Sequence, residues 1–442
     1  MNENINANVC RKCLAVGIIL LFVGTCIIPA IAQDIEKSSL PTSRGNWLYV
    51  GGSGPGNYTK IQDAINDSSA GDTVFVYDDS SPYYENVVIN KSINLIGKNQ
   101  ETTVIDGNGG FIVVFLTEMA FVEYVAVNGF TIQNGRIGID YDTGINNINM
   151  QSLLLNRKYT SSAGFYNNTL INNEIGIEVG WGSENVFLYN NKITTNKKAI
   201  VLDNCYFDND IYENTIVDND YGICLYNSPV NYIIENSIIS NKNDGIALSY
   251  SDSNTITRNT IINNTNGINL SNSDNNFIDY NQVRYNYFSV FLYYSHSNDI
   301  NKNVITENTL GICLLESSRN DIQGNTLENN EYAISLVLFS EQNKIIGNTI
   351  KSNSIRGLSL DGYCDENIIH KNNFIKNDRH AYFSNSFQNS WDENYWDNWI
   401  GLKINLSIFQ KFPKVIVGQT MITWINFDRH PAKEPYDVPV IS

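Results

Sequence analysis

The chain has 442 residues, of which 42% are hydrophobic, and it carries a formal net charge of −17 at pH 7. The hydrophobic share is enough for a packed core. The acidic balance argues against a nucleic-acid-binding protein, because neutralising phosphates requires basic groups, and it favours solubility and cation binding instead.

The first segment, residues 1–32, is predicted to be a signal peptide. Its apolar run over residues 14–28 is too short for a comfortable membrane span, and Ala30-Ile31-Ala32 fits the cleavage pattern. We therefore expect a secreted or cell-surface protein that is not an integral membrane protein after cleavage. An uncleaved anchor is the alternative. Residues 33–45 are predicted to be a flexible leader.

The residues that follow predict the start of a solenoid. A strand is expected at residues 47–50, and a short helix over residues 59–66 would place Ile61, Ala64 and Ile65 on one face. That helix would cap the open end, where strand edges and apolar core are otherwise exposed. Further strands are expected at residues 73–77, 87–89, 93–96, 103–105, 111–115, 122–127 and 138–139.

From residue 176 to 390 a motif returns every 22 to 24 residues, reading G-I-x-L and then isoleucines between regularly spaced asparagines. Self-similarity at this period indicates a solenoid. Short strands joined by sharp bends produce the rhythm, whereas a helix of 3.6 residues per turn does not. We predict an all-β parallel β-helix over residues 46–390, with roughly 13 coils at the usual strand spacing. An insertion around residues 145–163 should protrude as a loop.

Asparagines recur in register from coil to coil, so their amides are expected to stack in ladders at the bends, where Asn tolerates a left-handed backbone. This role is architectural. The three ladders are Asn231, Asn254, Asn276, Asn298, Asn320, Asn343 and Asn367; Asn236, Asn259, Asn281, Asn303, Asn325, Asn348 and Asn372; and Asn241, Asn264, Asn286, Asn308, Asn330, Asn353 and Asn377.

Four cysteines remain after cleavage, namely Cys205, Cys224, Cys313 and Cys364. Cys224 and Cys313 hold one position in coils four apart, about 19 Å at the strand spacing, which is far beyond disulfide reach. We predict no disulfides. An exported chain can be N-glycosylated at its N-x-S/T sequons. Because this chain is rich in Asn, some of its sequons arise by chance. The sequons are Asn57, Asn66, Asn90, Asn167, Asn263, Asn269 and Asn405.

The repeat stops near residue 390. Residues 391–442 hold four of the six tryptophans, Trp391, Trp396, Trp399 and Trp424. We predict a Trp-rich C-terminal cap over the last coil. An aromatic docking site is the alternative.

Two segments carry a family resemblance. Residues 61–97, with Ile61-Gln62-Asp63-Ala64-Ile65 and Ala70-Gly71-Asp72-Thr73-Val74, resemble the opening of pectin-lyase-like right-handed parallel β-helices. The Asn-rich coils and the ending at residues 391–396 resemble the NosD-type repeat family common in archaeal secreted and surface proteins. The resemblance implies a right-handed coil. It also implies copper handling, after the protein that names the family, or carbohydrate binding or cleavage, as in wider relatives.

Catalysis on this scaffold would need carboxylates in neighbouring coils, because one strand spacing brings them within working distance. Glu213, Glu235 and Arg258 form the most catalytic-looking trio in the coils. A solvated row of charges explains them equally well. The outward positions of the G-I-x-L strand offer only one acidic residue, Glu178.

Aromatic residues fall in the turn after the G-I-x-L strand, where a sugar ring could stack on them. Packing within the turn is the competing explanation. The predicted ligand-binding residues are Tyr226, Tyr250, Tyr293, Tyr294, Phe339 and Tyr363.

Metal sites are weakly indicated. Asp203, Asp208, Asp210 and Asp220 lie in loops of successive coils and could hold calcium through oxygen ligands, although turn aspartates are usually solvated. For copper, the chain has no Met-rich or His-rich run. Cys364, His370 and His380 share one coil but match no known ligand pattern.

These observations favour a non-catalytic protein that binds glycans or envelope components and needs no cofactor, with calcium as an option. The alternatives are a polysaccharide lyase or hydrolase and a NosD-like copper-handling accessory protein. A fold of this kind hosts many functions, and the sequence specifies neither the ligand nor an oligomeric state.

Overall fold

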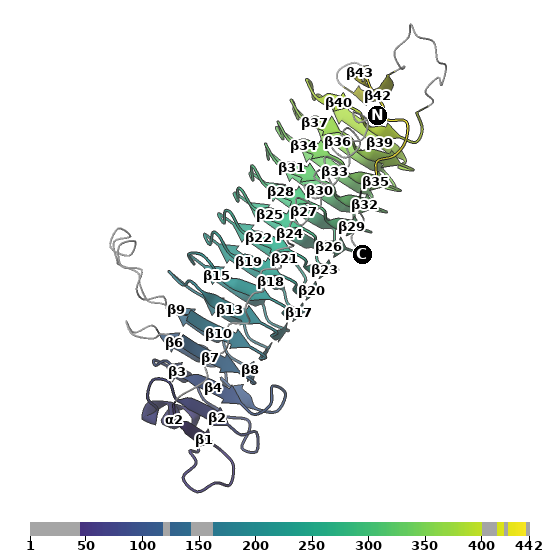
Figure 1. Cartoon of the computed structure of the whole chain (residues 1–442). Coiled ribbons are helices and arrows are strands. Elements are labelled where there is room, and N and C mark those ends of the chain that lie inside the picture. The colour runs from purple at the N-terminus through teal and green to yellow at the C-terminus, as the bar shows by residue number, and fades with distance from the viewer. Residues whose placement is uncertain (1–44, 118–123, 143–161, 400–412, 420–422, 439–442) are drawn as a thin grey trace, which may run out of the picture. The chain divides into compact units, whose positions relative to one another are not determined.

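The structure is a computed structural model that describes residues 45–117, 124–142, 162–399, 413–419 and 423–438, all within the unit Gly45–Ser442. The predicted signal peptide, the leader up to residue 44 and most of the predicted insertion lie outside these residues. The described strands form three parallel sheets, A, B and C, and consecutive strands visit the sheets in turn, so that each coil lies on the one before it (Figure 1). The chain is a right-handed parallel β-helix, as predicted.

Sheet A has 15 strands. They are β1 Trp47–Val50, β2 Thr73–Val76, β4 Asn94–Gly97, β7 Tyr124–Asn128, β10 Ser162–Tyr166, β13 Val186–Tyr189, β16 Asp210–Tyr212, β19 Tyr232–Ile234, β22 Thr255–Thr257, β25 Phe277–Asp279, β28 Asp299–Asn301, β31 Asp321–Gln323, β34 Lys344–Ile346, β37 Ile368–His370 and β40 Ser390–Asp392.

Sheet B has 13 strands. They are β5 Val104–Asp106, β8 Thr131–Gln133, β11 Thr169–Ile171, β14 Lys192–Thr194, β17 Thr215–Val217, β20 Ser237–Ile239, β23 Thr260–Ile262, β26 Gln282–Arg284, β29 Val304–Thr306, β32 Thr326–Glu328, β35 Thr349–Lys351, β38 Asn373–Ile375 and β41 Tyr395–Trp396.

Sheet C has 15 strands, the last two forming an antiparallel hairpin. They are β3 Val87–Ile89, β6 Ile112–Thr117, β9 Ile137–Asp142, β12 Ile175–Val179, β15 Lys198–Asp203, β18 Tyr221–Tyr226, β21 Asp244–Ser249, β24 Asn266–Ser271, β27 Phe288–Tyr293, β30 Leu310–Leu315, β33 Tyr332–Val337, β36 Arg356–Asp361, β39 Arg379–Ser384, β42 Lys414–Gln419 and β43 Thr423–Asp428.

The cap helix is α2, Ile61–Asp67, which begins two residues later than predicted. Its three apolar residues, Ile61, Ala64 and Ile65, are fully buried, as the predicted face requires. Glu85 holds its first turn, accepting hydrogen bonds from the backbone N–H groups of Ile61 and Gln62 at 2.8 and 3.0 Å. Among the described residues, no helix is both long enough and apolar enough to cross a membrane.

The core is a set of aliphatic columns, because each strand turns alternate side chains inward. In one coil, Ile246 and Leu248 of sheet C, Ile256 of sheet A and Ile261 of sheet B are all buried. The following coil repeats the pattern in strict register, with Ile268 paired to Ile246. Coil-to-coil stacking of this kind supplies stability through nearest neighbours.

The asparagine ladders are present and buried. At most rungs the amide Nδ2 and the backbone N–H both donate to the Oδ1 of the next coil; from Asn259 to Asn281 the distances are 3.0 and 2.9 Å. Of the two predicted reasons for Asn, amide stacking between coils is confirmed, and the tolerance of a left-handed backbone is wrong. The left-handed backbone belongs to the residue before each ladder asparagine, such as Glu235 before Asn236 with φ 56°. Asn is needed because one side chain must both donate and accept along the column.

A fourth ladder, which the sequence analysis missed, consists of serines in the turn before sheet A. Each backbone N–H donates to the next hydroxyl, for example Ser251 to Ser273 at 3.0 Å. Cys205 and Cys364 occupy serine positions in it, and their N–H groups donate to Ser228 and Ser386. All four described cysteines are free and buried, so these two are structural.

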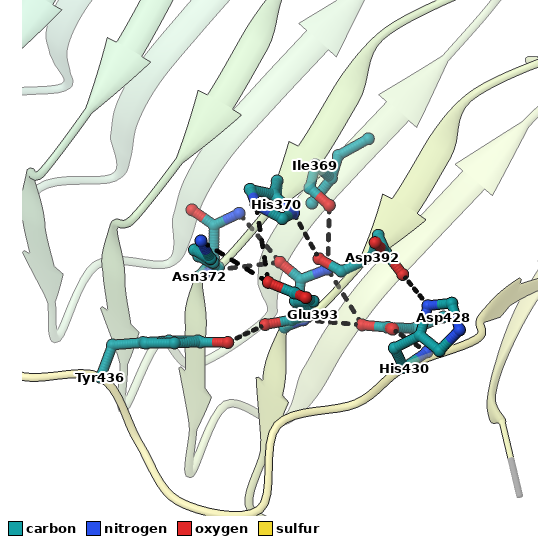
Figure 2. A network of polar contacts seen from close by, with 10 residues as sticks. Ile369, His370, Asn372, Asp392, Glu393, Asp428, His430 and Tyr436 are labelled. Carbon is teal, nitrogen blue, oxygen red and sulfur yellow. Dashed lines mark hydrogen bonds and ion pairs between the residues drawn. The ribbon is translucent and has the colours of Figure 1, made fainter. Parts of the chain in front are cut away.

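The predicted boundary at residue 391 falls inside a coil. Trp391 in β40 and Trp396 in β41 continue sheets A and B and are 4% and 2% exposed. The covering element is the hairpin β42–β43. Its Asp428 is fully buried and accepts hydrogen bonds at Oδ2 from the backbone N–H and the amide of Asn394, the last rung of the second ladder (Figure 2).

Candidate functional site

The outer face of sheet C carries three rows of side chains, aligned by the register of its strands. The central row is mostly buried between its neighbours: Cys224 is 0%, Ser359 2% and Ser335 4% exposed. The leading row contains Lys198, Tyr221, Asp244, Asn266, Phe288, Leu310, Tyr332, Arg356 and Arg379. The trailing row contains Asp203, Tyr226, Ser249, Ser271, Tyr293, Leu315, Val337, Asp361 and Ser384.

Two carboxylates stand side by side at the N-terminal end of the central row. Asp140 in β9 and Glu178 in β12 are direct register partners, so one strand spacing, about 4.8 Å, separates their backbones. Burial first, and then the charges of Glu178 and Asp142, raise the pKa of Asp140 to about 7. Burial and the nearby Asp203 also raise the pKa of Glu178, against Lys198 and Arg136, which lower it. The pair therefore favours holding one proton near neutral pH.

This pair predicts a pH dependence of stability. Because the pKa of Asp140 is raised in the folded state, its favourable contribution is complete below pH 3.8 and is lost as pH rises through about 7. Asp140→Asn should therefore stabilise the protein by about 2 kcal/mol at pH 8, after discounting for partial exposure, and change little at pH 4.

Chemical denaturation at both pH values measures this effect. Asp63→Asn, at an exposed carboxylate on α2, is the control and should show no such difference. An Asp140→Asn variant that is less stable than the wild type at pH 8 would contradict the inference that the ionised Asp140 destabilises the fold.

Within the clear repeats, Glu178 is the only acidic residue in the outward row of the G-I-x-L strand, and its partner is not among them. The partner lies one coil upstream, across the insertion, where Gly138-Ile139 is followed by Asp140. The structure places β9 directly beside β12. Extending the register through the insertion would have found the pair.

The predicted catalytic trio lies elsewhere. Glu213, Glu235 and Arg258 occupy one left-handed position in three adjacent coils, between sheets A and B. Glu235 and Arg258 form a loose ion pair at 3.9 Å, with side chains 48% and 63% exposed. Asp279 and Gln323, in later coils, are the last residues of β25 and β31 and lie one position earlier than this row. This arrangement is that of a solvated charged row.

The predicted aromatic residues gather at the trailing edge of sheet C, but in two registers. Tyr226 and Tyr293 end their strands, whereas Tyr250 and Tyr294 occupy the next, left-handed position. Tyr226 is engaged by Lys198, whose Nζ lies 4.9 Å from its ring centre. Tyr250 is 67% exposed.

Two pairs of these aromatic residues have rings exposed to solvent. The rings of Phe339 and Tyr363, each 53% exposed, stack with centres 5.5 Å apart and 8° between their planes. Tyr293 and Tyr294, 36% and 40% exposed, meet edge to face at 4.5 Å. We refer to these as the Phe339–Tyr363 pair and the Tyr293–Tyr294 pair. Both follow sheet C strands and lie along one edge.

An aromatic cluster that the sequence analysis did not assign lies on the outer face of β1 and β2. Trp47 and Tyr49 stack at 6.3 Å, Tyr49 lies 6.1 Å from Tyr77, and Phe75 meets Tyr77 at 5.1 Å. Trp47 is 50% exposed. The alternation of aromatic residues at 47, 49, 75 and 77 is the signal that could have found it.

The predicted calcium aspartates are not brought together as a group. Asp203 ends β15 beside the carboxylate pair, whereas Asp208 and Asp210 lie near each other at the start of strand β16. Asp220 is paired with Lys242 across the next coil. Across the described ranges, no group of three or more His, Cys, Asp and Glu side chains is placed to hold a metal ion.

The sequons divide by exposure. Asn66, Asn90 and Asn263 are exposed, whereas Asn57, Asn167 and Asn269 are half-buried. The amide of Asn269 faces Asp244 on sheet C. Asn405 lies outside the described residues. Modification at any of them stays a prediction.

Comparison with known proteins gives one family match. A family model described as "Periplasmic copper-binding protein (NosD)" matches residues 65–266, 127–305 and 234–401. No curated protein matches the chain.

Solved structures share the fold at low identity. DFA-IIIase from Arthrobacter chlorophenolicus A6 is 12% identical with a TM-score of 0.50, over 74% of this chain and 94% of that one. The A-module of the Azotobacter vinelandii mannuronan C-5 epimerase AlgE6 is 14% identical with a TM-score of 0.49, over 75% and 94%. The Dettilon tailspike protein is 13% identical with a TM-score of 0.45, over 76% and 68%. At these identities the likeness concerns the fold alone.

The described residues do not fit the copper that the family description implies. Burial raises the pKa of the Cys205, Cys313 and Cys364 thiols to about 12, which disfavours the thiolate that binds metal. The histidines are occupied singly: His430 Nδ1 bonds Asp392 at 2.7 Å, and His380 Nε2 bonds Asp397 at 2.7 Å (Figure 2 shows the former). Cys364, His370 and His380 lie apart in their coil: Cys364 is in the turn before sheet A, His370 ends β37 of sheet A, and His380 is in β39 of sheet C.

Proposed function

This chain belongs to the NosD family, and from that premise we propose that it acts outside the cytoplasm, secreted or at the cell surface, as a protein that binds glycans without altering them. The observation that carries the proposal is the set of exposed aromatic pairs along the trailing edge of sheet C. Exposed rings that lie together, rather than singly, can mark a binding surface. Their flat faces suit the apolar faces of sugar rings.

The spacing of the pairs supports a polymer as ligand. Tyr293 ends β27, and Phe339 follows β33 two coils later, so the two pairs lie about 10 Å apart by the strand spacing. A single small molecule would need only one pair. A chain lying along the coils could contact both, with Leu315 of the trailing row between them.

The test is a glycan-array screen of the purified protein, with affinities then measured for the glycans that bind. The double variant Phe339→Ala/Tyr363→Ala should weaken binding roughly tenfold or more, because each lost stacking contact is worth about 1 kcal/mol. Tyr84→Ala, at a tyrosine that is 68% exposed between β2 and β3, far along the chain from both pairs, is the matched control. Equal affinities for the double variant and the wild type would reject this edge as the site.

A second candidate function, polysaccharide hydrolysis, is favoured by the Asp140–Glu178 pair alone. Two carboxyls one strand spacing apart, with the pKa of Asp140 raised to about 7, resemble the acid and nucleophile pair of retaining glycosidases. The same screen, read for released products, tests it. Turnover that disappears in Asp140→Asn would replace the binding function by an enzymatic one.

A further inference from the structure

A pocket separate from the aromatic pairs opens between sheets B and C. It spans three successive coils and has a volume of about 490 Å³. Its lining residues form two rows along the coils, Tyr285, Glu307 and Asn329 in one and Tyr287, Thr309 and Glu331 in the other, with the buried ladder residues Asn286 and Asn308 between the rows in sequence. None of these residues was singled out as a binding residue from the sequence.

The chemistry of the pocket is aromatic and anionic together. Tyr285 and Tyr287 are 52% and 53% exposed, and both carboxylates are exposed as well. Glu307 accepts a hydrogen bond from the Tyr285 hydroxyl, which raises the pKa of that tyrosine and holds the carboxylate beside the ring. No ion pair with a described lysine or arginine occupies Glu307 or Glu331.

One cation lies nearby. The guanidinium of Arg284 is 5.8 Å from the centre of the Tyr285 ring, at the long end of cation–π range. Arg284 does not engage the ring of Tyr287 or the carboxylate of Glu331. The pocket therefore keeps a net negative charge in a protein whose formal charge is already −17.

We propose that this pocket binds the protonated amino group of an amino sugar within a glycan chain. Aromatic faces and carboxylates both attract an ammonium group, and the same faces stack on the sugar ring that carries it. The inference rests on the proposed glycan binding and names the class of glycan, one with free amino groups.

The position of the pocket fits a ligand shared with sheet C. The ring of Tyr287 meets that of Phe288 at 4.9 Å, and Phe288 lies 4.8 Å from Phe291. Phe288 and Phe291 are on the outer face of β27, whose other end carries the Tyr293–Tyr294 pair. Aromatic contacts thus run from the pocket to Phe291, on the strand that ends at the proposed glycan edge.

The experiment compares two oligosaccharides that differ only in N-acetylation and therefore in charge, the glucosamine hexamer and the N-acetylglucosamine hexamer, at a pH where the amines are protonated. The full-length protein should bind the glucosamine hexamer roughly tenfold more tightly, and added salt should reduce this difference. Glu307→Gln/Glu331→Gln should remove the preference by lowering the affinity for the glucosamine hexamer roughly tenfold. Glu101→Gln, at an exposed carboxylate far along the chain, is the control.

Each outcome is decisive. Equal affinity for the two hexamers, or a preference that survives in Glu307→Gln/Glu331→Gln, overturns the amino-sugar inference while glycan binding stands. If a lysine hexamer binds as tightly as the glucosamine hexamer, the sugar is not the recognised group, and the inference is overturned. Binding of neither oligosaccharide, when other glycans bind on the array, overturns this inference alone; an array without any binder overturns the proposed function with it.

Discussion

Asp428→Ala should destabilise the C-terminal coils by about 4 kcal/mol, because it leaves several buried donors without an acceptor. Oδ2 of Asp428 accepts from the backbone N–H of Asn394 at 2.9 Å, from its amide at 3.0 Å and from Trp396 Nε1 at 3.0 Å. Oδ1 accepts from the N–H of His430 at 3.2 Å. Every asparagine ladder must end somewhere, and this carboxylate ends the second one.

Asp428→Asn is the informative partner variant. An amide keeps one oxygen in the place where the ladder would put its next Asn, so most of the lost stability should return. The measurement is guanidinium unfolding followed by tryptophan fluorescence, which reports on Trp391 and Trp396 in the last coil. Since a solenoid loses coils from its ends, hydrogen exchange should show the loss confined to the C-terminal coils. Wild-type stability in Asp428→Ala would mean that the hairpin does not terminate the ladder.

Asn303→Ala should cost about 3 kcal/mol in the middle of the same ladder. The side chain is 1% exposed. Its Oδ1 accepts from the N–H and the amide of Asn281 at 2.9 and 3.0 Å, and its Nδ2 donates to the Ile278 carbonyl at 2.8 Å. Removing it leaves donors on one coil and acceptors on another unsatisfied in a dry interior.

The two ladder variants should differ in where stability is lost. Asn303→Ala weakens one interface in the interior, so hydrogen exchange should rise on both flanking coils, at β25 and β31. Asn90→Ala, at an exposed asparagine outside the ladders, should leave the unfolding midpoint unchanged. A loss that appears only at the chain ends would show that interior rungs are redundant.

The sequence by itself determined the coil and its period. A strict recurrence of Ile at the inward positions, with polar residues between, can bury an apolar face only as stacked strands, so the parallel β-helix and its register followed from Gly245 to Asn266 and its repeats. The cap helix could be predicted for the same local reason, since Ile61, Ala64 and Ile65 share one face. Family membership follows from the same repeats.

Only the tertiary structure decided which side chains meet across coils when the spacing is irregular. Asp140 and Glu178 are separated by an insertion, and Tyr285 and Glu331 by two full coils, so neither grouping is visible as a local pattern. Asp428 reaches the ladder from outside the repeat altogether. The physical reason is that a one-residue difference in a bend changes which face a side chain joins, and the backbone hydrogen bonds between coils, rather than local propensity, set that choice.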